Sequence, residues 1–185
     1  MNIVHHWLCS SGRWRRALEQ QLVPWVLDGI VTGDSLLELG PGPGLTTDLL
    51  RSRVARLMAV EIDDGLARRL ARRTANSNVR VIHGDAASLP FPDGTFSSAV
   101  SFTMLHHVPT AELQDRIFRE ARRVLRPGGV FCGTDGRAGF AMTLLHIADT
   151  LTPIDPHTLA ERLRTAGFTQ IDIDVRPARF RFRAS

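Results

Sequence analysis

From Ser35 onward, short apolar runs alternate with arginine-rich amphipathic stretches, and this alternation constrains the fold of the 185-residue chain more than any other feature. An apolar run of about four to eight residues suits a buried strand, and a longer amphipathic stretch suits a helix with one face on the core. Such alternation predicts a parallel sheet with helical crossovers. We expect strands at Ser35–Leu39, Arg56–Ile62, Val79–His83, Ser97–Phe102 and Val130–Thr134.

Helices are expected between and around these strands. The predicted ranges are Leu45–Arg53, Asp64–Ala75, Thr110–Leu125 and His157–Ala166. The third helix stops at Arg126-Pro127-Gly128-Gly129, because proline cannot continue a helix and glycine accepts a left-handed turn. A further helix is expected at Trp14–Leu27, with Pro24 as a kink or break. The segment Ala86–Thr95 holds two prolines and a glycine, so we expect little or no helix there.

The C-terminal segment alternates apolar and polar residues. Ile171, Ile173 and Val175 alternate with polar side chains, and Phe180 and Phe182 alternate with arginines. Two half-buried strands joined near Pro177 explain this period of two. They predict an antiparallel edge on an otherwise parallel sheet.

Composition places the chain among single-domain soluble proteins. Hydrophobic residues make up 43% and charged residues 23%, which excludes collagen-like and disordered classes. All the basic residues are arginine, yet the net charge is only +4, too small to indicate a nucleic-acid partner. Residues 1–16 lack the pattern of a signal peptide, and the longest apolar stretch, at 138–145, is too short to span a membrane. We therefore expect a cytoplasmic protein.

A glycine-rich turn follows the first expected strand. In the segment Leu36–Leu45, glycine occupies every second position of the turn, at Gly40, Gly42 and Gly44. Glycine removes the Cβ atom, so a ligand can approach the main chain at the carboxyl edge of the sheet. The helix that opens behind the turn adds N–H donors. A tight strand-to-helix turn without a ligand is the alternative explanation.

Acidic residues lie at the ends of the next two strands. Glu61 follows Gly40 by 21 positions and can accept both hydroxyl protons of a ribose, which indicates a nucleoside ligand. Asp85 can accept the exocyclic amine of an adenine, with the N–H of Ala86 reaching a ring nitrogen. The alternatives are a solvated strand-end charge for Glu61 and a turn or capping role for Asp85.

The order and spacing of these segments resemble the class I S-adenosylmethionine-dependent methyltransferases, in the small-molecule branch that includes quinone-biosynthesis methyltransferases. The resemblance covers about residues 34–175. It rests on ELGPGPG at 38–44, AVEID at 59–63, GDA at 84–86 with LPF at 89–91, FSSAVSF at 96–102 and VLRPGG at 124–129. It implies an α/β, Rossmann-like, doubly wound sheet of seven strands, mostly parallel with an antiparallel last strand and helices on both faces. The implied cofactor is S-adenosyl-L-methionine.

The resemblance also implies roles for individual residues. The three glycines would hold the methionyl part of the cofactor, and Glu38 would brace the loop or meet the amino group. The ribose would bind Glu61, and the adenine would contact Ile62, Asp85 and Ala86. The carbonyl of Ser101 would accept from the methionyl ammonium.

Two histidines follow the fourth strand, beside the expected position of the methyl group. Because histidine titrates near neutral pH, His106 or His107 could accept a proton from the methyl acceptor. The alternative is that they orient the loop or line the cofactor pocket. The stretch Phe140–Leu151 lies where this family builds substrate lids, although core packing explains its apolar residues equally well.

We expect the chain to divide into an N-terminal helical cap, residues 1–33, and a cofactor-binding methyltransferase domain, residues 34–185, within one compact unit. His5, His6 and Cys9 lack a third close ligand, so we expect no metal. We expect this N-terminal segment to fold over the cofactor, with Trp7 and Trp14 as packing residues.

The expected activity is methyl transfer to a small-molecule acceptor by in-line displacement, with no nucleic-acid partner. One rival is a nucleic-acid methyltransferase, which the absence of a proline pair after Ser101 disfavours. A second is an NAD(P)-dependent oxidoreductase, against which Leu45 and the Gly84-Asp85 pair argue, since Leu45 breaks the dinucleotide-binding pattern. A third is a catalytically silent relative. The sequence leaves the acceptor and a possible homodimer open.

Overall fold

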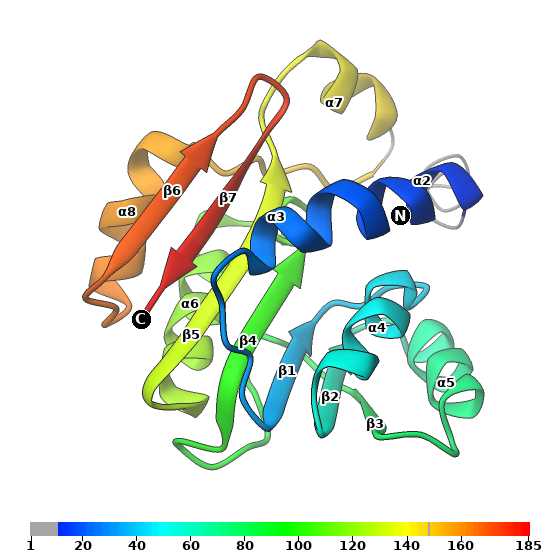
Figure 1. The fold of residues 1–185 in the computed structure, drawn as a ribbon. Helices are drawn as coiled ribbons and strands as arrows, with labels where there is room; N and C mark the ends of the chain where they lie inside the picture. The colour runs from blue at the N-terminus through cyan, green and yellow to red at the C-terminus, as the bar shows by residue number, and fades with distance from the viewer. Residues whose placement is uncertain (1–10, 148) are drawn as a thin grey trace.

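The computed structural model describes residues 11–147 and 149–185. Its centre is a seven-stranded sheet in the order β3-β2-β1-β4-β5-β7-β6 (Figure 1). Strands β1 to β5 run parallel, and β7 runs antiparallel to both β5 and β6. The predicted Rossmann-like α/β fold is therefore confirmed. The strands are β1 Ser35–Leu39, β2 Arg56–Glu61, β3 Val79–His83, β4 Phe96–Phe102, β5 Leu125–Gly136, β6 Ile171–Val175 and β7 Arg179–Ala184.

Helices cover both faces of this sheet (Figure 1). The α-helices are α2 Gly12–Ala17, α3 Val23–Leu27, α4 Leu45–Leu50, α5 Asp64–Arg73, α6 Ala111–Val124, α7 Phe140–Leu145 and α8 Pro156–Thr165. Short segments of other helix types are η1 Leu18–Leu22, η2 Arg51–Arg53 and η3 Leu105–His107. Among the described residues, no helix combines the length and the apolar character that a membrane crossing requires.

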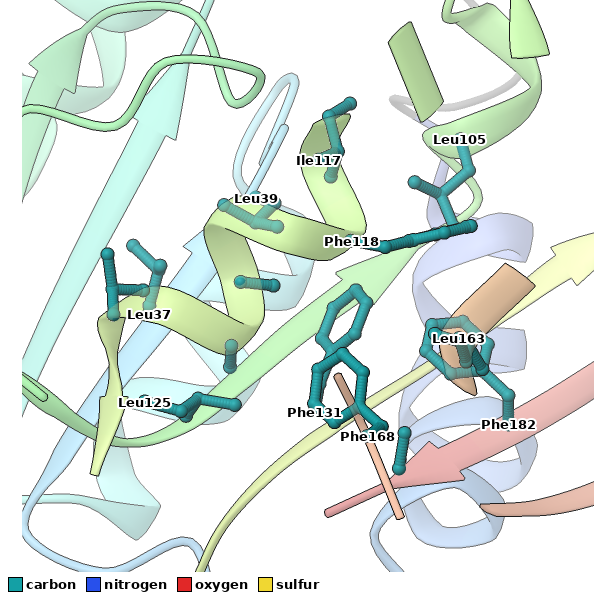
Figure 2. Close-up of a cluster of buried hydrophobic side chains, with 14 of the residues drawn as sticks. Leu37, Leu39, Leu105, Ile117, Phe118, Leu125, Phe131, Leu163, Phe168 and Phe182 are labelled. Atoms are coloured by element: carbon teal, nitrogen blue, oxygen red, sulfur yellow. The ribbon is translucent and has the colours of Figure 1, made fainter. Parts of the chain in front are cut away.

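The core forms two layers, because successive side chains of a strand point to opposite faces. Leu37 joins the larger cluster, beneath α6 and α8, whereas Leu36 joins the cluster beneath α3 and α4. In the larger cluster, the rings of Phe131 and Phe182 meet edge to face at 4.9 Å between centroids. Figure 2 shows Phe118 and these two rings gathered on one side of the sheet. This packing fixes the central strands, whose carboxyl ends carry the candidate site.

The strand order places that site. The chain moves outward from β1 to β2 and β3, then returns to the other side of β1 for β4. At such a reversal, the loops leaving neighbouring strands diverge and open a crevice beyond the carboxyl ends of the strands. The glycine turn after β1 and the loop after β4 therefore lie on opposite sides of one crevice.

The N-terminal helix is not broken at Pro24. It changes instead to a π-helical turn at Leu18–Leu22, in which the N–H of Val23 donates to the carbonyl of Leu18, five residues back. Pro24 then occupies the first turn of α3, where its missing N–H costs no intrahelical bond. The wide turn replaces the expected kink.

Several predicted boundaries shift by one or two residues, and the largest difference is at the start of β5. Helix α6 ends at Val124, and β5 begins at Leu125 because this residue pairs with Phe96 before the register shifts. As expected, residues 84–95 contain no helix. Arg123 holds that loop, donating to the carbonyls of Leu89 and Phe91 at 3.0 and 2.7 Å.

Candidate active site

A cavity of about 460 Å³ lies at the carboxyl ends of β1 to β4. Its volume falls in the range of ordinary small-molecule sites. The wall is built from the turn after β1, the ends of β2 and β3, the loop after β4, helix α6, the N-terminal helix and residues 149–150. Of the residues predicted from the sequence, the cavity is lined by Gly40, Gly42, Glu61, Ile62, Asp85, Ala86 and His107, and the rest of the predicted set lies behind this wall.

The three glycines of the turn have different roles. All have left-handed backbones, with φ of 62° at Gly40, 56° at Gly42 and 82° at Gly44. A Cβ at Gly40 would collide with Met104, and a Cβ at Gly44 would come within 2.5 Å of Leu70. At Gly42 a Cβ would meet no atom within 4 Å. A ligand can therefore lie directly against the Cα of Gly42, whereas Gly40, which also lines the cavity, and Gly44 allow Met104 and Leu70 to pack closely against the turn.

Glu38 lies behind the glycine turn and does not line the cavity. Its carboxylate accepts hydrogen bonds from the hydroxyls of Thr46 and Thr47, the latter at 2.6 Å. Burial raises the pKa of the Glu38 carboxyl from 4.5 to about 7, although the two threonine hydroxyls act to lower it. Glu38 thus ties β1 to the first turn of α4.

Glu61, at the end of β2, is held in a fixed orientation. One carboxylate oxygen accepts from the N–H of Gly42 at 2.8 Å, and the other accepts from the N–H of Asp63 at 3.0 Å. The side chain is 5% exposed and faces the cavity. An ionised carboxylate can accept about four hydrogen bonds, so two further acceptor positions remain for ligand hydroxyls.

The end of β3 contributes an accessible carboxylate. Asp85 is exposed and accepts from the N–H of Ala87 through one oxygen, at 2.8 Å. Ala86 lies beside it in the cavity wall. Ile62, which follows β2, is 68% exposed and lines the same wall. An apolar surface, an acceptor and main-chain atoms therefore lie together there.

At the end of β4, the cavity is lined one residue later than the predicted position. Ser101 is buried within the sheet, paired with Leu39 and Gly133, and the lining begins at Phe102. Thr103 has a φ of 50°, an uncommon conformation for a β-branched residue. Its N–H donates to the carbonyl of Thr134 at 2.8 Å.

The two adjacent histidines separate in space. His107 lines the cavity, whereas His106 is buried behind it. The Nδ1 of His106 bonds the carboxylate of Asp135 on β5, which also accepts the main-chain N–H of His106 at 3.2 Å. His106 therefore holds the η3 turn in place, and His107 is the histidine that can touch a ligand.

Several lining residues escaped the sequence prediction. Leu18 lines the cavity together with Trp14, which we had expected to be a packing residue. Asp149 and Thr150 line it as well. The helical period of 14–27 could have identified Leu18, and Asp149 and Thr150 fall within the stretch Phe140–Leu151 that the resemblance placed at the position of a substrate lid. The expectations for His5, His6, Trp7 and Cys9 fall outside the described residues.

The charged residues that line the cavity are mostly acidic. It includes four acidic residues, which are Glu61, Asp63, Asp85 and Asp149. The basic residues of this chain are arginines, yet none of the described lining residues is an arginine. The cavity is therefore suited to a ligand with cationic and hydroxyl groups rather than to a phosphate.

Comparisons with known proteins agree with this geometry. Residues 37–133 match the family model described as a methyltransferase domain. A probable S-adenosylmethionine-dependent methyltransferase of Mycolicibacterium smegmatis is 33% identical over 145 residues, or 74% of this chain and 52% of the relative. The demethylmenaquinone methyltransferase of Clavibacter sepedonicus is 27% identical over 188 residues, covering 86% of this chain and 73% of the relative. The chain thus spans about half the length of the first relative.

Among solved structures, the PH0226 protein of Pyrococcus horikoshii superposes with a TM-score of 0.80. The match covers 97% of this chain and 94% of that protein, at 18% sequence identity. At that identity the likeness concerns the fold.

Proposed function

We propose that this chain, which belongs to the class I S-adenosylmethionine-dependent methyltransferases, methylates a small-molecule acceptor in the cavity at the carboxyl ends of β1 to β4. Its cofactor is S-adenosylmethionine. The cavity fits this molecule in volume, in the open backbone at Gly42 and in its four carboxylates. A sulfonium and an ammonium group both favour negative surroundings.

The bound cofactor supplies a methyl group that is electrophilic because it is attached to a positively charged sulfur. The protein's task is to hold cofactor and acceptor in line and to exclude water. We assign the ribose hydroxyls to the two remaining acceptor positions of Glu61. The adenine is assigned to Ile62, Asp85 and Ala86, and the methionyl part to the main chain at Gly40 and Gly42. Glu38 and Gly44 support this turn from behind.

One observation carries the choice of acceptor class: the described lining contains no arginine. An enzyme that reads a nucleic acid neutralises phosphates with basic side chains near the reacting base. Here the arginines lie elsewhere, many in ion pairs such as Arg162 with Asp115 at 2.7 Å. This distribution favours an acceptor without phosphates.

The far end of the cavity favours an acceptor with an apolar body. Val108, Leu113 and Ile117 line it beside His107. The similarity to a demethylmenaquinone methyltransferase supports an aromatic acceptor of the quinol type. We propose that His107 contacts the reactive atom of the acceptor and that His106 is a positioning residue. Proton acceptance by either histidine stays a prediction.

The proposed division of the chain keeps residues 1–33 as a cap on the domain at 34–185. The described part of the cap contributes Trp14 and Leu18 to the cavity wall. Leu18, with Leu22 and Trp25, packs on Leu45 and Leu49 of the domain. Such a cap would exclude water from the reacting groups.

Calorimetric titration with S-adenosylhomocysteine tests the cofactor assignments. Glu61→Gln should weaken binding by about tenfold to a hundredfold, because hydrogen bonds to a charged group contribute roughly 1.5–3 kcal/mol. Asp85→Asn should weaken it less, since Asp85 is exposed and accepts one main-chain N–H, whereas Glu61 is buried and accepts two. Glu161→Gln, an exposed glutamate on α8, is the matched control and should bind as the parent protein does. If the parent protein and the three variants bind S-adenosylhomocysteine with equal affinity, the assignments are refuted. If the parent binds NAD(H) and does not bind S-adenosylhomocysteine, the oxidoreductase is favoured.

Methyl incorporation from labelled S-adenosylmethionine tests the acceptor class. Phenols and reduced quinones should be labelled, and RNA should not. Label in RNA with none in small molecules would overturn the proposal. Binding without transfer to any acceptor in a broad panel would favour a silent relative.

A further inference from the structure

Three histidines from two distant segments meet beside the cavity. His106 and His107 belong to η3 after β4, and His146 follows α7. Their ring centroids lie 4.2 Å apart for His106 and His107, 4.9 Å for His106 and His146, and 5.1 Å for His107 and His146. One nitrogen from each ring lies within 4.8 Å of the other two. The cluster is therefore a compact triangle of imidazoles.

The partners of two of these rings fix their tautomers. The Nδ1 of His106 meets the carboxylate of Asp135, which only accepts when ionised. The Nδ1 of His146 lies 2.7 Å from the carbonyl of Met142, which likewise only accepts. Both Nδ1 atoms must therefore carry the proton. In a neutral ring the lone pair then resides on Nε2, as in most histidines that bind metals.

We propose that His106, His107 and His146 bind one divalent transition-metal ion of the zinc type. With bonds of about 2.1 Å, ligand nitrogens of a tetrahedral zinc site lie about 3.4 Å apart, so the widest pair would close by at most about 1.4 Å. Imidazole favours zinc, iron, cobalt, nickel and copper over magnesium and calcium. Asp135 and the carbonyl of Met142 supply the outer hydrogen bonds that orient such ligands.

Three protein ligands leave one coordination position of the metal ion open. Because His107 lines the cavity, this open position would face the cavity. A consequence that rests on the proposed function is that the open position binds an oxygen of the acceptor. The cation would lower the pKa of that hydroxyl, whose proton would leave to solvent. The oxygen would then bond to the methyl carbon as the bond between that carbon and the sulfonium sulfur breaks, which releases S-adenosylhomocysteine. His107, as a ligand, would then hold the cation rather than accept the proton itself, and it would reach the acceptor oxygen through the cation rather than by the direct contact assigned above.

Titration of the untagged, chelator-treated full chain with CoCl₂ tests the site, because Co²⁺ gives a visible absorption band whose intensity reports its geometry. The parent protein should bind one Co²⁺ with an intense band, and ZnCl₂ should displace it. His107→Gln and His146→Gln should each weaken Co²⁺ binding by about a hundredfold or more, since even loss of an outer-shell partner costs about 10–100-fold. His83→Gln and His157→Gln change exposed histidines away from the cluster and should bind as the parent does.

Folding of each variant is checked by its melting temperature and by its affinity for S-adenosylhomocysteine. Asp135→Asn adds a graded test, because it should weaken Co²⁺ binding while leaving the three ligands in place. The proposal is overturned if the parent binds no Co²⁺, or if the His107 and His146 variants bind it as tightly as the parent. Normal Co²⁺ binding in a protein that fails to bind S-adenosylhomocysteine would refute the proposed function and leave the metal site standing.

Discussion

The buried carboxyl of Glu38 should make the stability of this protein depend on pH near neutrality. In the folded state burial raises its pKa to about 7, whereas an exposed glutamate titrates at 4.5. The folded protein therefore holds this proton more tightly than the unfolded chain does. The stabilisation from the protonated carboxyl is complete below pH 4.5, falls as the pH rises, and is lost above about pH 7.

The size of the effect follows from the displacement of the pKa. One pKa unit corresponds to about 1.36 kcal/mol, so a rise from 4.5 to about 7 corresponds to about 3 kcal/mol over the full range. Between pH 5 and pH 8 the loss should amount to about 2.5 kcal/mol of unfolding free energy. Glu38→Gln removes the titrating group but keeps the shape of the side chain and one acceptor for Thr46 or Thr47. The unfolding free energy of this variant should therefore lack the pH dependence that Glu38 causes.

Urea unfolding of the parent and the Glu38→Gln variant at several pH values between 5 and 8 measures the component directly. Titrations shared by both proteins cancel in the difference. From pH 5 to pH 8, the unfolding free energy of the variant should rise by about 2.5 kcal/mol relative to that of the parent. A difference that stays constant with pH would show that Glu38 keeps an ordinary pKa and that its burial has been misjudged.

Three further predictions concern the scaffold. Gly44→Ala should lower the unfolding free energy by about 2–4 kcal/mol, from left-handed strain and the contact with Leu70, whereas Gly42→Ala adds only the left-handed strain and should lower it by about 1–2 kcal/mol while weakening S-adenosylhomocysteine binding; equal losses of stability in urea would contradict this. Burial raises the pKa of the Cys132 thiol to about 12, so in a Cys9→Ser background Ellman's reagent should react only as the protein unfolds. Arg123→Ala should cost about 2 kcal/mol in urea unfolding by releasing the loop after β3, and an unchanged midpoint would refute that role.

The sheet was largely predictable from the sequence, because each strand is either a short apolar run or an alternation of apolar and polar residues, and both patterns are local signals. The turn at Gly40 to Gly44 and the carboxylates Glu61 and Asp85 were found because they immediately follow such runs. Sequence could not separate the glycines, however. Whether a glycine faces a ligand or a packed side chain depends on Met104 and Leu70, which are distant in sequence.

The rest of the site depends on contacts between distant segments. His146 lies 40 residues from His106, and no periodicity or spacing indicates that the two rings meet. Asp135 lies within β5, and nothing in the sequence distinguishes it from other strand residues. Only the structure shows that its carboxylate bonds to His106.

A crystal structure with S-adenosylhomocysteine bound tests the central claim most directly, namely that one cavity at the carboxyl ends of β1 to β4 holds both cofactor and acceptor. We predict ribose hydroxyls within hydrogen-bond distance of Glu61, the adenine against Ile62 and Asp85, and the sulfur facing His107. A ligand bound outside this cavity, or one whose ribose does not touch Glu61, would contradict the account.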